Sequence, residues 1–289
     1  MNNGRCFFVV LVLAGLLASR PAGGQRPIPY SALNPVQESL DSHAGVELRS
    51  SLEGIASEMR LIPPSALGCN NPVYARIKKL SDGTWFLMYH NGRIGSSVWY
   101  NLSKDLVHWD PPQLLFSARP ARTPAGDDQW RYSSADAIVL KGGELLAYAA
   151  LRADKGYRYY PECNHIAMRR SRDNGRTWEA EEFIYDGTAW EPFMLELPYG
   201  KLQCYFTDTE PQKFNSGTSI VESLDGGHTW GPGGVGNCYK VIRQYKYTDG
   251  DTPVYTDQMP CVRVLNDGHT LLGFMESRLG HRPDVTEST

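Results

Sequence analysis

The chain contains the octapeptide Ser171-Arg-Asp-Asn-Gly-Arg-Thr-Trp178 and, later, Ser223-Leu-Asp-Gly-Gly-His-Thr-Trp230. Both fit the pattern S-x-D-x-G-x-T-W, and a shortened copy reads Ser103-Lys-Asp-Leu-Val-His-Trp109. In such a stretch the Ser and Asp side chains can accept hydrogen bonds from the N–H groups of their own turn. Gly supplies a left-handed position, and the indole packs as a wedge. We therefore predict that each copy is a hairpin tip that ends one strand and begins the next.

Four other segments share a second pattern, in which an extended apolar stretch ends in Leu, a turn contains Gly, and another apolar stretch follows. They are Tyr74–Leu80, Ser134–Leu140, Glu191–Leu197 and Met259–Leu265. Each predicts two strands joined by a tight hairpin. The turn glycines recur every 57 to 68 residues, which is about the length of one four-stranded blade and its connections. An all-β propeller is therefore predicted, because the alternative, a β-sandwich, would not explain octapeptides that recur at one position of each repeat.

The N-terminal residues predict a cleaved secretory signal over residues 1–24. Arg5 gives a positive start, Cys6–Ala18 is an apolar run too short to cross a bilayer, and small residues follow. We expect a secreted or periplasmic monomer, with a lead-in over residues 25–60 and the propeller over residues 61–289. The formal net charge of −3, without a basic block, argues against nucleic acid or a membrane surface as partner.

The cysteines and histidines predict no metal site and no other cofactor. Of the six cysteines, Cys6 falls in the signal segment, and the remaining five have no C-x-x-C spacing. Most of them are expected to be buried as small apolar residues. His90 and His165 have no partner at a ligand spacing, so metal binding is not predicted for either.

Aligning the four hairpin segments on their final Leu allows equivalent positions of the innermost strands to be compared. Four residues before that Leu stand Arg76, Asp136, Phe193 and Cys261, and six before it stand Tyr74, Ser134, Glu191 and Met259. Because side chains alternate along a strand, both sets should lie on one face, at the central channel. Charged groups there should face a wet cavity or pair with one another. Arg76, Asp136 and Glu191 are therefore candidate site residues.

These motifs resemble the Asp boxes and inner strands of the sialidase-like β-propellers, which include sialidases and neutral-sugar exo-glycosidases. The resemblance implies a six-bladed propeller, of which about four blades fall in this chain, the last before its own octapeptide. It also implies that Arg76 contacts a substrate carboxylate and that Glu191 is catalytic. Arg152, after an apolar strand, and Asp154 beside it match an Arg contact and a general acid. Arg278, after the last strand, is a further candidate Arg contact.

Departures from the sialidase pattern bear on the substrate. Lys78 replaces a Pro, Asp136 stands where an Arg would in the second blade, and the strand ending at Asp208 lacks the second Arg. A sialic acid would use Arg76 for its carboxylate and Glu191 to activate a Tyr, whereas a neutral sugar such as arabinose would need two carboxylates, Asp136 and Glu191. We therefore predict a secreted exo-acting glycoside hydrolase that removes one of these terminal sugars from a glycan. A non-catalytic carbohydrate-binding propeller is the alternative.

Overall fold

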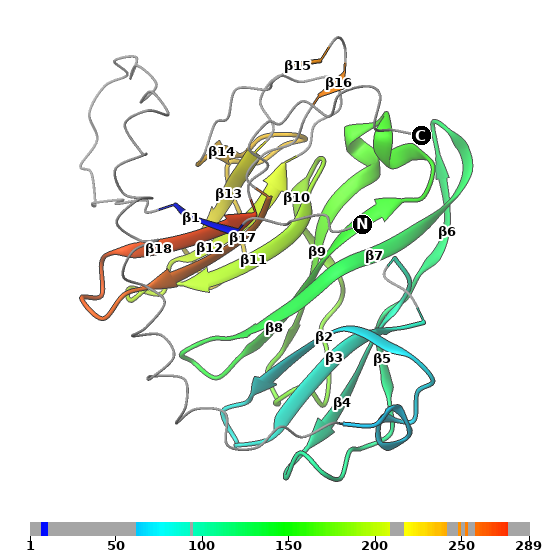
Figure 1. Cartoon of the computed structure of the whole chain (residues 1–289), viewed down its shortest axis with the longest axis vertical. Helices are drawn as coiled ribbons and strands as arrows, with labels where there is room; N and C mark the ends of the chain where they lie inside the picture. The colour runs from blue at the N-terminus through cyan, green and yellow to red at the C-terminus, as the bar shows by residue number, and fades with distance from the viewer. Residues whose placement is uncertain are drawn as a thin grey trace. The chain divides into compact units, whose positions relative to one another are not determined.

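The computed structural model describes residues 7–10, 62–92, 95–208, 217–241, 248–249, 252–253 and 258–276. Its strands form antiparallel sheets that follow one another along the chain, from cyan to red-orange in Figure 1. The short helices η2 (Pro64–Leu67), η3 (Gly156–Arg158) and η4 (Pro161–Cys163) lie in connections. Among the described residues, no helix is long and apolar enough to cross a membrane.

Three of the sheets have the strand order of a propeller blade, with each strand beside the next in sequence. The first sheet comprises β2 (Pro72–Lys79), β3 (Trp85–Asn91), β4 (Val98–Ser103) and β5 (Gln113–Phe116). The second comprises β7 (Gly126–Val139), β8 (Leu145–Ala153), β9 (Asn164–Ser171) and β10 (Glu182–Asp186), with β6 (Arg119–Thr123) added beside β7. The third comprises β11 (Trp190–Glu196), β12 (Leu202–Asp208), β13 (Gly217–Ser223) and β14 (Tyr239–Lys240).

A fourth sheet is built on the hairpin of β17 (Gln258–Val264) and β18 (Leu271–Glu276). The segment β1 (Phe7–Val10), within the predicted signal, pairs antiparallel with β18. A separate two-stranded sheet joins β15 (Thr248–Asp249) and β16 (Thr252–Pro253). The first strands of successive sheets pack against one another, β7 between β2 and β11, and β11 beside β17. The predicted all-β propeller arrangement is thus confirmed for these sheets.

The octapeptides form the predicted turns between the third and fourth strands of their sheets. Ser171 Oγ accepts the N–H of Gly175 at 2.8 Å, and Asp173 Oδ1 accepts the N–H of Thr177 at 2.8 Å. Hydrogen bonds from the hydroxyl and N–H of Thr177 lower the pKa of Asp173 to about 2. The second copy repeats this bonding through Ser223 and Asp225. The turn chemistry inferred from the sequence is therefore present at both sites.

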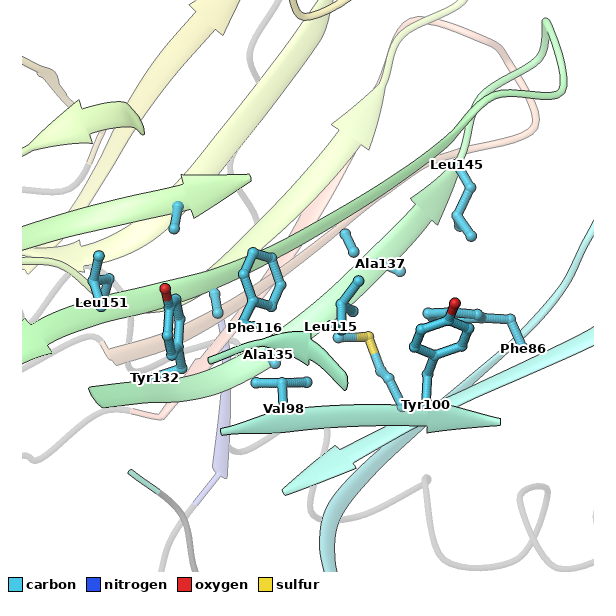
Figure 2. Close-up of a cluster of buried hydrophobic side chains, with 14 of the residues drawn as sticks. Phe86, Val98, Tyr100, Leu115, Phe116, Tyr132, Ala135, Ala137, Leu145 and Leu151 are labelled. Atoms are coloured by element: carbon cyan, nitrogen blue, oxygen red, sulfur yellow. The ribbon is translucent and has the colours of Figure 1, made fainter. Parts of the chain in front are cut away.

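The indoles of the octapeptides pack between neighbouring sheets. Trp178 lies with its ring centroid 5.8 Å from Phe86 and 5.8 Å from Tyr100, both in the first sheet. Figure 2 shows this buried cluster, in which Phe86 lies beside Tyr100 and Phe116 lies near Tyr132. Trp230 occupies the equivalent place in the cluster between the second and third sheets. Each octapeptide thus closes an apolar interface with an adjacent sheet.

Polar contacts also join the turns of neighbouring sheets. Ser81 Oγ, in the first hairpin of the first sheet, donates to Asn174 Oδ1 in the octapeptide turn of the second at 2.8 Å. Arg170 donates to the carbonyl oxygen of Gly226 in the octapeptide turn of the third sheet at 2.8 Å. The Arg170 side chain is only 4% exposed, so this contact is made inside the interface. Sequence-distant turns are therefore linked directly.

The innermost strand of all four sheets carries a β-bulge at the same place. The register with the second strand shifts between Val73 and Arg76, Ser133 and Asp136, Trp190 and Phe193, and Gln258 and Cys261. Inside each bulge one residue other than glycine has a left-handed φ, namely Tyr74 at 56°, Ser134 at 51°, Glu191 at 51° and Met259 at 54°. The regular alternation assumed from the sequence is therefore interrupted between the two aligned positions.

We expect the protein to lose stability as the pH falls, because of His90 in β3. This side chain is fully buried, and burial lowers its pKa from 6.5 to about 4. Between these values the unfolded chain binds a proton that the folded chain does not, so the free energy of unfolding decreases by on the order of 3 kcal/mol. Urea unfolding at neutral pH and near pH 4 measures this loss.

The variant His90→Gln should remove this part of the pH dependence, whereas His228→Gln, at an exposed octapeptide position, should keep it. Equal pH slopes for the wild type and His90→Gln would contradict the assignment.

Candidate active site

Arg76 and Asp136, predicted from equivalent positions of adjacent inner strands, lie together. Asp136 Oδ2 is 3.9 Å from Arg76 Nε, and its Oδ1 is 2.9 Å from Lys78 Nζ. The guanidinium of Arg76 also lies 4.2 Å from the centre of the Tyr74 ring. Asp136 has only 12% of its side chain exposed, whereas that of Arg76 is 38% exposed. Two cations of β2 thus hold a nearly buried carboxylate of β7 and leave one guanidinium reachable.

Glu191 lies on β11 with the left-handed backbone of the bulge. Its Oε2 accepts a hydrogen bond from Thr207 Oγ1 at 3.4 Å, and the same hydroxyl accepts the N–H of Met259 at 3.0 Å. Burial raises the pKa of Glu191, and the negative charge of Glu276 raises it further. The hydroxyl of Thr207, the Met259 N–H and the charge of Arg152 oppose this rise. Because the net effect raises the pKa, the Glu191 carboxyl keeps its proton to a higher pH than an ordinary glutamate does.

Arg152 lies at the end of β8. It acts electrostatically on Glu191 and also contacts the loop that follows β8. Its guanidinium carbon lies 3.6 Å from the centre of the Trp190 ring and 5.0 Å from that of Tyr157. Burial lowers the pKa of Arg152, while the charges of Tyr157, Asp154 and Glu191 raise it. Its Nη1 is buried without a hydrogen-bond partner among the described residues. The guanidinium of Arg152 therefore makes cation–π contacts with both rings, and its charge acts on Glu191.

Asp154 is the first residue of the loop that follows β8. Its Oδ2 pairs with Arg131 Nη2 at 3.0 Å, and half of its side chain is exposed. Arg131 lies opposite Arg152 in the register of β7 and β8. The charges of Asp154 and Glu191 both act on Arg152 and raise its pKa, so these three predicted residues are linked electrostatically.

Among the predicted residues, Arg76 and Asp136 thus form an ion pair, and Arg152 interacts electrostatically with Asp154 and Glu191. Arg278 lies outside the described residues. Asp208, where the sialidase pattern would place a second Arg, is fully buried and pairs with Lys240. No group of three or more possible metal ligands occurs in the part of the chain that the structure describes.

Sequence reasoning did not select Lys78, Thr207, Trp190 or Glu276 as site residues. Glu276 ends β18 and pairs in register with Gln258, just as Thr207 pairs with Trp190 in the preceding sheet. Aligning the second strands as well as the first would have brought Thr207 and Glu276 to equivalent positions. Trp190 and Lys78 adjoin predicted residues and could have been found by extending each motif.

A cavity of about 160 Å³ lies elsewhere, between β10 and the octapeptide turn of the third sheet. Its lining includes Glu182, Asp186, His228 and Trp230 but none of the predicted site residues. The candidate site residues that the structure describes therefore do not line this cavity.

Solved structures similar to this chain include three glycoside hydrolases. The GH93 α-L-arabinofuranosidase of Fusarium graminearum, in complex with arabinobiose, matches with a TM-score of 0.51 and 21% identity, over 74% of this chain and 59% of that one. The α-L-arabinanase of Penicillium chrysogenum matches with a TM-score of 0.46 and 21% identity, over 68% and 55%. The Hadza microbial sialidase Hz136 matches with a TM-score of 0.45 and 15% identity, over 65% and 39%. No protein-family model matches the chain, and no curated protein sequence does.

The similarity to the arabinofuranosidase concerns the fold. Over the matched part, the chain shares the fold of that enzyme. It spans 59% of the length of the arabinofuranosidase, 55% of the arabinanase and 39% of the sialidase.

Proposed function

We propose that the protein is an exo-acting glycoside hydrolase that removes a terminal sugar from a glycan. The observation that carries the proposal is Glu191, a carboxyl held in a left-handed bulge with its pKa raised by burial. A perturbed carboxyl beside aromatic rings and a cation is typical of a proton donor at a sugar site. Secretion through the N-terminal signal and action as a monomer belong to the same proposal.

In the proposed reaction, the carboxyl of Glu191 gives its proton to the glycosidic oxygen as the bond to the anomeric carbon breaks. A carboxylate on the other side of the sugar then stabilises the positive charge at that carbon. We assign this role to Asp136, on the adjacent inner strand and paired with Arg76 and Lys78. Water adds to the anomeric carbon, and the water proton passes to a carboxylate. Glu276, whose charge acts on Glu191, is the other candidate for this second role.

A neutral sugar fits these residues better than a sialic acid. Recognition of a sialic carboxylate would call for several free guanidinium groups. Arg76 already lies near Asp136 and over Tyr74, and Arg152 is stacked on Trp190. The arabinofuranosidase with the same fold acts on a neutral sugar by its name. An α-L-arabinoside is therefore our first candidate substrate.

The test is hydrolysis of two fluorogenic aryl glycosides, an α-L-arabinofuranoside and a sialoside, by the purified protein. Turnover of the arabinoside that is lost in Asp136→Asn supports the two-carboxylate proposal. Loss in Glu276→Gln but not in Asp136→Asn would move the second role to Glu276. Turnover of the sialoside alone, abolished by Arg76→Ala, would assign the acidic sugar instead. Binding of arabinobiose without turnover would support a carbohydrate-binding propeller and overturn the enzymatic proposal.

A further inference from the structure

The left-handed bulge residues occupy one equivalent position in all four inner strands, six residues before the final Leu. They are Tyr74, Ser134, Glu191 and Met259. None is glycine, asparagine or aspartate, the residues that adopt this conformation most easily. In a β-bulge one residue is also left out of the pairing with the neighbouring strand. Four blades therefore carry the same unfavourable backbone conformation at the same level of the fold.

Unfavourable backbone conformations that persist in a fold cluster at functional sites, where the surrounding structure over-determines them. Here Glu191 is the residue that the proposed function makes the proton donor. Met259 is tied to it, because the Thr207 hydroxyl accepts the Met259 N–H and donates to the Glu191 carboxyl. Tyr74 is tied to the other predicted group, since its ring carries the guanidinium of Arg76. The bulge residues thus include or contact members of both groups of candidate site residues.

The side chains at the bulges differ in character around the channel. Glu191 and Ser134 are polar and belong to the two middle sheets, whereas Tyr74 and Met259 are largely apolar and belong to the first and fourth sheets. Met259 has 41% of its surface exposed although it is apolar, and Ser134 has only 8%. A sugar presents hydroxyl groups at its edge and C–H groups on its faces, so it suits a polar centre with apolar flanks.

We infer that the accessible bulge residues Tyr74, Glu191 and Met259 contact the ligand and that Tyr74 and Met259 determine sugar specificity on either side of Glu191. This inference rests on the proposed function and deepens it. The bulge recurs in every inner strand and is therefore a feature of the repeat. Tyr74, Glu191 and Met259 differ from Ser134 because their side chains are accessible and each is linked to a candidate site group.

The strain is tested first, by comparing alanine with glycine at one position. Met259→Ala and Met259→Gly remove the same side chain, but only glycine adopts a left-handed φ without a steric penalty. We expect Met259→Gly to unfold at a higher temperature than Met259→Ala. Arg263, exposed on the same strand and without a left-handed φ, gives the matched control. There the order should reverse, with Arg263→Gly unfolding at a lower temperature than Arg263→Ala.

Ligand recognition is tested in the same proteins. Met259→Gly and Tyr74→Gly should raise KM for the aryl arabinoside, and the Kd of arabinobiose, at least tenfold with a much smaller change in kcat. Leu106→Gly serves as the control, because Leu106 has a φ of 64° in the shortened octapeptide turn, away from the inner strands. It should be more stable than Leu106→Ala, with KM and Kd unchanged.

Three results would contradict the inference, and they are distinguishable. A wild-type protein that binds sugar, together with Met259→Gly and Tyr74→Gly variants of unchanged KM and Kd, would leave the proposed function standing and overturn the assignment of these bulge residues as ligand contacts. A wild-type protein that neither binds nor cleaves any sugar tested would remove both. An alanine variant at position 259 more stable than its glycine counterpart would contradict the strained backbone itself.

Discussion

Glu191→Gln should lower kcat by about 100- to 10,000-fold, since an amide of the same shape cannot give a proton to the glycosidic oxygen. The substitution keeps the hydrogen bond from Thr207 Oγ1, because the amide oxygen can still accept it. KM should change little if the role of Glu191 is proton transfer. Initial rates on the aryl arabinoside across a range of pH measure the effect, and the variant should lose the high-pH limb that Glu191 sets.

Glu196→Gln, five residues along the same strand, is the matched control. The Glu196 carboxylate accepts the N–H of Lys141 at 2.7 Å, in the hairpin of the second sheet, and so serves the contact between sheets. Its variant should keep its activity. Equal losses in Glu191→Gln and Glu196→Gln would mean that β11 matters for folding and that Glu191 is not the proton donor.

Trp178→Ala is expected to produce the largest loss of stability, a decrease in the free energy of unfolding of about 3 kcal/mol. The indole fills the space between the first and second sheets and contacts Phe86 and Tyr100. Removing it takes away the contacts with both rings and with the buried cluster around them. Chemical denaturation with an unchanged dependence on denaturant concentration would attribute the loss to the native state.

Leu224→Ala is the control for this change. Leu224 occupies the second position of the other octapeptide and is 82% exposed, so its removal should alter stability by less than about 0.5 kcal/mol. If Trp178→Ala were as mild as Leu224→Ala, the octapeptide would act through its turn alone, and the wedge role of the indole would be wrong.

The turns and the strand order could be predicted from the sequence because their causes are local. Ser171 and Asp173 bond N–H groups within four residues of themselves, and the hairpin glycines lie at fixed distances from the strands they join. Such features leave a short, repeated signature. The bulges do not, because Tyr74, Ser134, Glu191 and Met259 share no side-chain chemistry. Their common backbone conformation results from the pairing of whole strands.

The site was predictable only in part, for a related reason. Arg76, Asp136 and Glu191 were selected by their equivalent positions in the repeats, and Arg76 and Asp136 do lie together. In the sequence, Lys78 stands out only as a departure from the sialidase motif. In the structure, its ammonium nitrogen lies closer to the Asp136 carboxylate than the Arg76 guanidinium does. Distances between side chains of different sheets depend on how the sheets pack, which the alignment of one strand per sheet cannot supply.

The links between turns of neighbouring sheets bear on how the protein unfolds. In a repeat architecture stability is a sum of terms for each repeat and for each interface between adjacent repeats. Two hydrogen bonds, Ser81 with Asn174 and Arg170 with Gly226, join polar groups of neighbouring repeats. If the third sheet opened alone, the nearly buried guanidinium of Arg170 would lose its bond to the Gly226 carbonyl and keep its pairing with Glu144 in its own sheet. Because such interface contacts couple neighbouring blades, we expect these blades to unfold together. The candidate site has residues from several blades, so it should be lost in one cooperative step.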